Sequence, residues 1–364
     1  MEEARKTNRR QFLAGKSATA ALGDAVNALL GPVETTESGE ASLPEGYLLE
    51  FSRRAMACQF AIFLNAGQST QQSDAACAAL DLVDQLEAQL SIFRDTSEIS
   101  LINRHAAREP VKIEPRLAEL LALAERISRE TGGAYDISAG PLVRVWGFVR
   151  RQGAMPDDAA LAEARAAVGQ HLIELDPAGR TIRFLHPGVE LNLGSIGKGY
   201  ALDRAAEVLA AAGASDFLLH GGQSSVLARG ACVESGRAEA WSIGLPHPYR
   251  RTERLGQIRL DDRALSTSGS ATQFFMHEGR RLGHILDPRT GLPIEGVLSA
   301  TAIAPTAAEA DALSTAFYVL GPQAVEQYCA SHAGVGAIFV LPAARYPAID
   351  VRTFGVAEEL FTAR

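Results

Sequence analysis

Apolar residues recur every three or four positions along several stretches of the chain, and this spacing predicts amphipathic helices. From Gln72 to Leu90, for example, the apolar positions are 76, 80, 83, 86 and 90. A glycine stop, Thr131-Gly132-Gly133, ends another such stretch and supports its assignment as a helix. The predicted helices cover residues 72–90, 115–130, 157–168, 200–212, 307–320 and 322–332.

Shorter apolar segments predict strands between these helices. Residues 91–103 are predicted to be a loop that runs into a short turn. Helices and strands mix without a strict βαβ rhythm, so the sequence predicts an α+β fold of mixed sheets with flanking helices, without internal repeats. The predicted strands lie within 47–64 and at 181–185, 189–193, 216–220, 241–245, 256–260, 282–286, 298–304 and 335–341.

The first 45 residues stand apart from this pattern. Asn8-Arg9-Arg10-Gln11-Phe12-Leu13 resembles a twin-arginine export signal, and a mildly apolar stretch follows up to Leu30. We therefore interpret residues 1–45 as a signal and linker, and residues 46–364 as the folded domain. The expected location is periplasmic or exported, and the signal would also allow association with a membrane. The alternative is a cytoplasmic protein whose basic N-terminus contains two arginines by chance.

Composition narrows the classes of function. The 364 residues are 47% hydrophobic and 21% charged, which is typical of a globular protein with a sizeable core, in one large domain or two intimate ones. A net charge of −8 argues against a nucleic-acid binder. The four cysteines are scattered, without a Cys-x-x-Cys pair or Cys/His cluster, so neither a zinc site nor a disulfide scaffold is expected.

A glycine-rich segment, Asn192–Asp203, is a candidate phosphate-binding loop. Its three glycines between a predicted strand and a predicted helix let backbone approach a ligand closely. The N-terminus of the helix attracts anions, and Lys198 adds a positive charge. The segment is not a Walker A loop, because Gly199 follows the lysine where Ser or Thr is required. Taken alone, a glycine turn with a surface lysine explains it at least as well.

A second candidate lies on the predicted helix 307–320. Asp311, Ser314 and Thr315 are spaced to face the same side of that helix. One carboxylate and two hydroxyls suit Mg²⁺, which binds few protein oxygens together with phosphate and water. Taken alone, an ordinary solvated helix face is favoured.

A histidine is the candidate general base. His284 begins the predicted strand 282–286, and its ordinary pKa lies near neutral. A turn of the form Asp-Pro-x-x-Gly follows at 287–291. A Ser/His/Asp hydrolase is the competing interpretation, but the chain has no Gly-x-Ser-x-Gly elbow to expose a nucleophile.

These segments, in this order, resemble the ApbE family of FAD:protein FMN transferases. The family's patterns are TGGxFDxTxGPLVxLWGF, DLGxIAKGYAVD, TSGxxxxxF followed by HIIDPRTGxP, and ADALATALFVLG. A further match is SIFRDTSEISLIN, to the pattern SxYxxxSExSxLN. Ordered matches spread over roughly residues 47–350 are far more specific than any one of them. The other matching segments are TGGAYDISAGPLVRVWGF, NLGSIGKGYALD, TSGSATQFF, HILDPRTGLP and ADALSTAFYVLG.

The resemblance implies site residues one by one. His284 remains the candidate base. The implied magnesium ligands are Ser195, Asp311, Ser314 and Thr315. The residues implied to bind FAD are Met56, Phe93, Ala134, Tyr135, Asp136, Asn192, Lys198 and Ile285.

The implied activity is magnesium-dependent transfer of FMN from FAD to a Thr or Ser hydroxyl of an acceptor flavoprotein, with release of AMP. One alternative is a non-catalytic FAD-binding protein of the same fold, and another is an FAD pyrophosphatase that yields FMN and AMP. Three departures from the family pattern bear on this choice. Asn192 replaces an acid, Gln223 follows a Gly-Gly pair where Asp or Asn is frequent, and Ser270 stands where an acid or amide is common.

Overall fold

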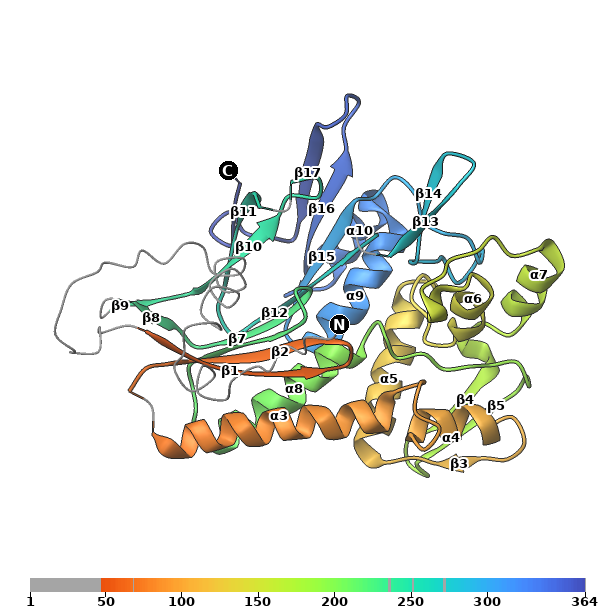
Figure 1. Cartoon of the computed structure of the whole chain (residues 1–364), viewed down its shortest axis with the longest axis horizontal. Helices are drawn as coiled ribbons and strands as arrows, with labels where there is room; N and C mark the ends of the chain where they lie inside the picture. The colour runs from red at the N-terminus through yellow and green to blue at the C-terminus, as the bar shows by residue number, and fades with distance from the viewer. Residues whose placement is uncertain (1–46, 68, 235–236, 251, 271–272, 364) are drawn as a thin grey trace, which may run out of the picture.

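The computed structural model describes residues 47–363 apart from 68, 235–236, 251 and 271–272. An eight-stranded sheet forms its centre, in the order β1-β2-β6-β7-β12-β15-β16-β17 (Figure 1). All neighbouring strands in it run antiparallel. The strands are β1 (Leu48–Ala55), β2 (Cys58–Asn65), β6 (Phe217–Gly221), β7 (Ser225–Arg229), β12 (Ala264–Gly269), β15 (Ser299–Ala304), β16 (Gly336–Pro342) and β17 (Ile349–Phe354).

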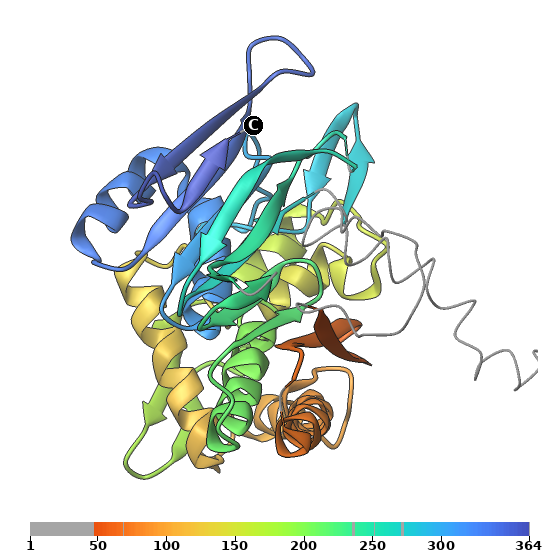
Figure 2. The same ribbon diagram turned by 90° about the vertical axis from the view of Figure 1, so that its left-hand side faces the viewer.

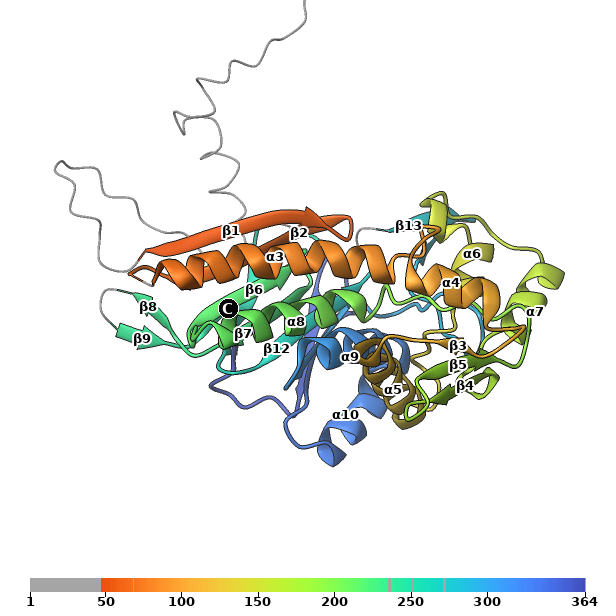
Figure 3. The same ribbon diagram turned by 90° about the horizontal axis from the view of Figure 1, so that it is seen from below.

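Helices cover one face of this sheet. The long helix α3 (Thr70–Leu90) lies beside α8 (Gly197–Ala211), and α8 lies beside α9 (Ala307–Leu320), as Figure 3 shows from below. Helix α5 (Pro115–Glu130) packs against α9, and α10 (Pro322–Ser331) follows it. Figure 2 shows α3, α5 and α8 gathered on the same side of the strands. Their apolar faces and the sheet enclose the larger of the two main cores.

The opposite face of the sheet is covered by a small sheet, which explains why the central strands are apolar on both sides. Successive residues of β2 alternate between the two cores: Phe60 and Ile62 point to the helices, whereas Ala61 and Phe63 join the second core. Trp241 is fully buried in that second core. The small sheet consists of β10 (Trp241–Pro246), β11 (Arg254–Leu260) and β18 (Phe361–Ala363).

The remaining elements form a lobe beside the ends of α3 and α8 (Figure 1) and two hairpins. A third apolar cluster, which includes Trp146 and Phe148, joins this lobe to the hairpin β13–β14. These elements are β3 (Val111–Lys112), β4 (Ile173–Asp176), β5 (Thr181–Phe184), β8 (Cys232–Glu234), β9 (Arg237–Glu239), β13 (Phe274–His277), β14 (Arg280–Gly283), α4 (Glu98–His105), α6 (Gly140–Val145), α7 (Asp158–Ala166), η1 (Phe148–Arg150) and η2 (Gln170–Leu172).

The predicted α+β class is confirmed, and every predicted helix is present. Among the described residues, no helix has both the length and the apolar character to cross a membrane. The interpretation of residues 1–45 as a signal lies outside the described residues. Three local predictions were wrong.

The predicted loop at 91–103 contains helix α4. The Ser97 side chain caps its first turn by accepting a hydrogen bond from the Ser100 N–H at 3.0 Å. Only Ile99 and Ile102 of this helix are buried. Two apolar positions are too few to reveal a helical period, so the sequence pattern did not indicate this helix.

The predicted strand at 189–193 is an extended segment with a single isolated bridge, between Glu190 and Ala139. The Asn103 side chain makes the backbone hydrogen bonds that a neighbouring strand would otherwise make. It accepts a hydrogen bond from the Leu191 N–H at 2.8 Å and donates one to the Leu191 carbonyl at 3.0 Å. The alternation of apolar residues at 189–193 therefore reflects burial of these side chains, and the segment does not pair as a strand in a sheet. The third error concerns 282–286, because β14 ends at Gly283 and places His284 after a strand instead of at its start.

Candidate active site

A buried aspartate on helix α9 is the centre of the candidate site. Asp311 is 3% exposed, and its carboxylate accepts hydrogen bonds from the hydroxyls of Ser266 at 2.9 Å and Ser225 at 3.1 Å. The backbone N–H of Gly199 donates to it at 3.1 Å. The Lys198 ammonium lies 3.2 Å and 3.3 Å from its two oxygens. The structure thus brings the glycine-rich loop and helix 307–320 together, as the interpretation of both segments requires.

The close crossing of helices α8 and α9 makes this contact possible. A Cβ atom on Gly199 would lie 2.0 Å from the carbonyl oxygen of Ala307, so no larger residue fits there without moving a helix. The Asp203 carboxylate also fixes the crossing, because it accepts hydrogen bonds from the first N–H groups of α9, those of Ala307 and Ala308, at 2.8 Å each. Burial raises the pKa of Asp203 to about 6.

Three further hydroxyl groups lie beside Asp311, two on α9 and one on the neighbouring strand β12. The Ser268 hydroxyl lies 2.9 Å from that of Ser314 and 3.2 Å from that of Thr315. Ser266 and Ser268 share one face of strand β12, since alternate residues of a strand point the same way. The sequence analysis did not assign roles to Ser225, Ser266 or Ser268. No strand was predicted over 264–269, and the alternation of Ser266 and Ser268 was the available signal for the last two.

The loop before α8 and the loop after α5 contribute further predicted residues. Asn192 accepts a hydrogen bond from the Gly194 N–H at 2.9 Å and so braces the loop. The Tyr135 side chain is fully buried. A side-chain hydrogen bond with Ser195 and the charge of Asp311 both affect the pKa of its hydroxyl. Burial raises the pKa of Tyr135, which keeps the hydroxyl protonated.

His284 lies at the edge of this cluster. Its Nδ1 is 3.1 Å from the backbone carbonyl of Gln273, and Phe148 packs edge-on against its ring. Burial lowers the pKa of His284, and the positive charge of Lys198 lowers it further. The imidazole is therefore neutral near pH 7. Because a carbonyl only accepts hydrogen bonds, Nδ1 carries the proton and Nε2 is left as the acceptor.

The remaining predicted residues do not share the hydrogen bonds of this cluster. Met56 lies in the β1–β2 turn with a φ of 49°, and Phe93 is 73% exposed in the loop after α3. Ala134 and Ile285 are buried. The Asp136 carboxylate is occupied within its own loop, where it accepts from the backbone N–H and the hydroxyl of Ser138 at 2.8 Å and 2.6 Å.

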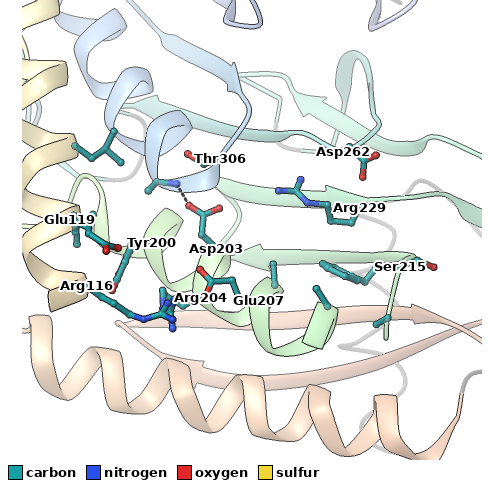
Figure 4. A pocket seen from close by; sticks show the side chains of 17 residues that line it. Arg116, Glu119, Tyr200, Asp203, Arg204, Glu207, Ser215, Arg229, Asp262 and Thr306 are labelled. Carbon is teal, nitrogen blue, oxygen red and sulfur yellow. Dashed lines mark hydrogen bonds and ion pairs between the residues drawn. The ribbon is translucent and has the colours of Figure 1, made fainter. Parts of the chain in front are cut away.

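A cavity of about 600 Å³ lies elsewhere, between α5, α8 and strands β6 and β7 (Figure 4). Its polar lining residues on α8 are Tyr200, Asp203, Arg204 and Glu207, which project from the face of the helix opposite Lys198. Arg204 and Arg116, on neighbouring helices, both pair with Glu207. We assign the chemistry to the Asp311 cluster because its donors converge on one point, whereas these cavity charges neutralise one another.

Known proteins resemble this chain over most of its length. A sequence profile of the ApbE family matches residues 56–339. The FAD:protein FMN transferase of Klebsiella pneumoniae is 34% identical over 258 residues, 69% of this chain and 71% of its own length. That of Haemophilus influenzae is 32% identical over 287 residues, 76% of this chain and 82% of its own length.

The chain belongs to the ApbE family.

A solved structure supports the same assignment. The apo form of the flavinyl transferase ApbE from Pseudomonas stutzeri superposes with a TM-score of 0.77 and 27% identity, over 89% of this chain and all of that one. The expected family membership and fold are thus confirmed. The roles of individual site residues stay predictions.

The residues present in this ApbE-family chain fit a magnesium ion only if a phosphate completes its shell. Among the described residues, no three acidic, histidine or cysteine side chains gather as a metal site. Asp311 offers the one carboxylate of the cluster, and Ser195, Ser314 and Thr315 offer neutral oxygens. Mg²⁺ commonly binds through one or two carboxylates plus substrate phosphates and water, so this donor set suits a metal that arrives with a phosphorylated substrate.

Proposed function

We propose that this protein transfers FMN from FAD to a serine or threonine hydroxyl of an acceptor protein, releases AMP, and depends on magnesium. The observation that carries the proposal is the meeting of Lys198, the N-terminus of α8 and the buried carboxylate of Asp311 at one point. A cation, a helix N-terminus and a metal-binding carboxylate together suit a diphosphate. The names of the relatives, FAD:protein FMN transferase, support the same activity.

Each group in the cluster has a separate task in this proposal. Lys198 and the α8 N-terminus bind and orient the phosphates of FAD. Asp311, with Ser195, Ser314 and Thr315, would hold the metal. Magnesium, when bound, offsets the negative charge of the phosphates. The surrounding burial keeps water from the phosphates and strengthens these electrostatic interactions.

His284 is the proposed base. Its neutral imidazole leaves Nε2 able to accept the proton of the acceptor hydroxyl. That hydroxyl oxygen forms a bond to the FMN phosphorus, the bond from that phosphorus to the bridging oxygen breaks, and AMP leaves with the bridging oxygen. The product is FMN joined to the acceptor through a phosphoester.

The acceptor separates this activity from FAD hydrolysis. A pyrophosphatase would use the same residues and deliver the FMN phosphorus to water, so the two activities differ only in what attacks. Two of the departures from the family pattern are accommodated locally: Asn192 braces its loop, and the Ser270 hydroxyl accepts a hydrogen bond from Tyr318 at 3.1 Å. Gln223 is exposed. These features support retained activity.

The decisive experiment measures AMP release and flavin attachment together. The protein is incubated with FAD, Mg²⁺ and an acceptor domain, with liberated AMP quantified and bound flavin read by in-gel fluorescence. Asp311→Asn keeps the shape of the side chain and removes its charge, and we expect a loss of about 100-fold, the scale of a principal electrostatic contact in a transition state. Asp350→Asn, at an exposed aspartate paired with Arg352, is the matched control.

Two results would contradict the proposal. Turnover of Asp311→Asn equal to the parent at limiting Mg²⁺ would refute the metal assignment. Release of AMP without flavin on the acceptor would instead identify the pyrophosphatase. Circular dichroism of each variant shows whether the fold is retained.

A further inference from the structure

The hairpin β13–β14, which projects beside α6 in Figure 1, presents large apolar side chains to solvent. Phe274 and Met276 are 43% and 60% exposed, and they alternate along β13 with Phe275, which packs on the third apolar cluster. Arg281 lies opposite Met276 in the strand pair, with its guanidinium 3.8 Å from the centre of the Phe274 ring. Exposed apolar groups that lie together commonly mark an interaction site. Phe274, Met276 and Arg281 form what we call the hairpin face.

The hairpin face is held beside His284, the proposed base. Phe274 pairs with Gly283, the residue before His284, and the His284 N–H donates to the Gln273 carbonyl at 3.2 Å. The same carbonyl is 3.1 Å from Nδ1 of the imidazole. Gln273 is fixed in turn, because its side-chain amide donates to the Phe148 carbonyl at 2.9 Å. The imidazole and the hairpin face therefore belong to one hydrogen-bonded unit.

The size of a protein interface brings the hairpin face within reach of any protein that binds at His284. The four residues of β13 span only about 13 Å, at about 3.3 Å per residue. A stable interface covers about 800 Å² on each partner, which corresponds to a patch about 30 Å across. A protein that presents a hydroxyl to His284 would therefore also contact the hairpin face.

The charges around the hairpin face indicate the chemistry of its partner. Segments 148–151 and 273–283 contain four arginines and one acidic residue, whereas the whole chain has a net charge of −8. Arg280 is paired with Glu295. Among the described residues, Arg150, Arg151 and Arg281 form no ion pair with a carboxylate. Unpaired arginines beside exposed apolar groups favour an acidic partner surface.

We propose that the hairpin face is the docking surface for the acceptor protein, and that it binds an acidic segment of that protein which carries an apolar side chain. The inference rests on the proposed function and names the surface that brings the acceptor hydroxyl to His284. Phe274 and Met276 would contact the apolar side chain, and the arginines would attract the acidic groups. Aromatic, methionine and arginine side chains are enriched at protein interfaces, which supports this use of the hairpin.

The test uses an acceptor domain that the parent protein labels in the transfer assay. Initial rates of flavin attachment are measured against acceptor concentration at saturating FAD, at low and high salt, and FAD affinity is measured by calorimetry. Met276→Asp and Arg281→Glu change the hairpin face. Leu185→Asp and Arg183→Glu are the matched controls, because Leu185 is 52% exposed and Arg183 is exposed on β5, in another part of the lobe. Circular dichroism checks the fold of each variant.

The two hairpin variants should weaken only the interaction with the acceptor. Met276→Asp should raise the KM for the acceptor about 10-fold, the scale of a residue at the centre of an interface, with kcat and FAD affinity unchanged. Arg281→Glu should raise this KM at low salt and less at high salt, because salt screens the attraction between exposed charges. Both control variants should behave like the parent.

Several results would overturn the inference. Parent-like acceptor KM values in both hairpin variants would exclude docking at this surface, while the proposed function stood. Weakened FAD binding in both would place the hairpin at the flavin site.

Other occupants of the surface give different results. A parent dimer in sedimentation that Met276→Asp dissociates would assign the face to a second copy of this chain. Binding of the parent, and not of Met276→Asp, to vesicles of anionic phospholipid would assign it to a membrane. A parent protein that labels no acceptor domain would refute the proposed function, and this inference with it.

Discussion

Asp311 is a buried carboxylate that the protein neutralises from within. Four groups donate to it, and one of them, Lys198, is a cation of the kind that a metal would have to displace or share with. In the proposed site, the ammonium and a magnesium ion would compete for the same two oxygens. The affinity for a metal would therefore depend on the position of Lys198, and a phosphate that draws the lysine away would favour the metal.

Replacement of this lysine tests the competition. Lys198→Met should raise the affinity of the FAD-free protein for Mn²⁺ about 10-fold or more, because the ammonium no longer occupies the two carboxylate oxygens. A tenfold change corresponds to only about 1.4 kcal/mol, less than the attraction between unit charges about 4 Å apart near a protein surface. The same variant should bind FAD more weakly. The Mn²⁺ affinity is read by electron paramagnetic resonance.

The control for that measurement is Lys112→Met, at an exposed lysine that contacts only the Gly179 carbonyl in the described hydrogen-bond network. It should leave both affinities unchanged. Unaltered Mn²⁺ binding in Lys198→Met would show that the ion pair does not limit access of metal to Asp311.

At the scale of elements, the crossing of α8 and α9 determines whether the site exists. The two helices approach so closely at Gly199 that the backbone of one touches the other. This contact brings Lys198 to Asp311, and Asp203 holds the second helix by its first N–H groups.

Two glycine-to-alanine substitutions distinguish the effect of this close packing on stability from the effect of helix propensity. Gly199→Ala should destabilise the protein by about 3 kcal/mol or more, since a methyl group 2.0 Å from a carbonyl oxygen forces the helices apart. Gly197→Ala, two residues earlier, meets only a leucine methyl at 4.0 Å and should be neutral or slightly stabilising. Chemical unfolding gives both values, and equal effects would rule out the close crossing.

The cap on α9 predicts a pH dependence. The pKa of Asp203 rises from 3.8 to about 6 on folding, so the folded protein holds this proton more tightly than the unfolded chain does. The stabilisation by protonated Asp203 is therefore complete below about pH 4 and is lost as pH rises through 6, a change of about 3 kcal/mol.

Asp203→Asn removes this titration. The free energy of unfolding of the parent relative to this variant should fall between pH 4 and pH 6. Asp262→Asn, at an exposed aspartate that lines the same cavity, should retain the pH profile of the parent. A parent and an Asp203→Asn variant with parallel profiles would contradict the burial of this carboxylate.

The sequence predicted these elements unequally, for physical reasons. Helices α3, α5 and α9 are long enough for an apolar period to repeat, and they were predicted closely. Helix α4 is short and was missed, and the segment 189–193 is apolar without pairing as a strand. Asp311 could be singled out from its motif, whereas its partner Ser225, a single serine on another strand, gave no signal by itself.

At the scale of the whole molecule, the proposed location follows from residues outside the described part of the chain. We propose that the protein is exported through the twin-arginine route, which the Arg9-Arg10 pair indicates. Replacement of both by lysine should leave the protein inside the cell. Arg5→Lys, outside the pair, should not.

Cell fractionation followed by immunoblotting checks this prediction. Export of the double-lysine variant at the level of the parent would refute the twin-arginine assignment. Retention of both variants would indicate that arginine side chains across the N-terminus, and not the pair alone, are required, because lysine keeps the positive charge.

The candidate site is assembled from distant parts of the chain: the β1–β2 turn, the loop after α5, the start of α8, strands β7 and β12, and helix α9 (Figure 1). Because α9 is among the last of these to be synthesised, a growing chain lacks Asp311 until most of it has left the ribosome. In the proposed function, FAD would therefore bind the finished protein and could not guide the early steps of its folding. Flavin binding would then mark chains whose synthesis has passed α9, and a polypeptide truncated before this helix would lack the Asp311 part of the site.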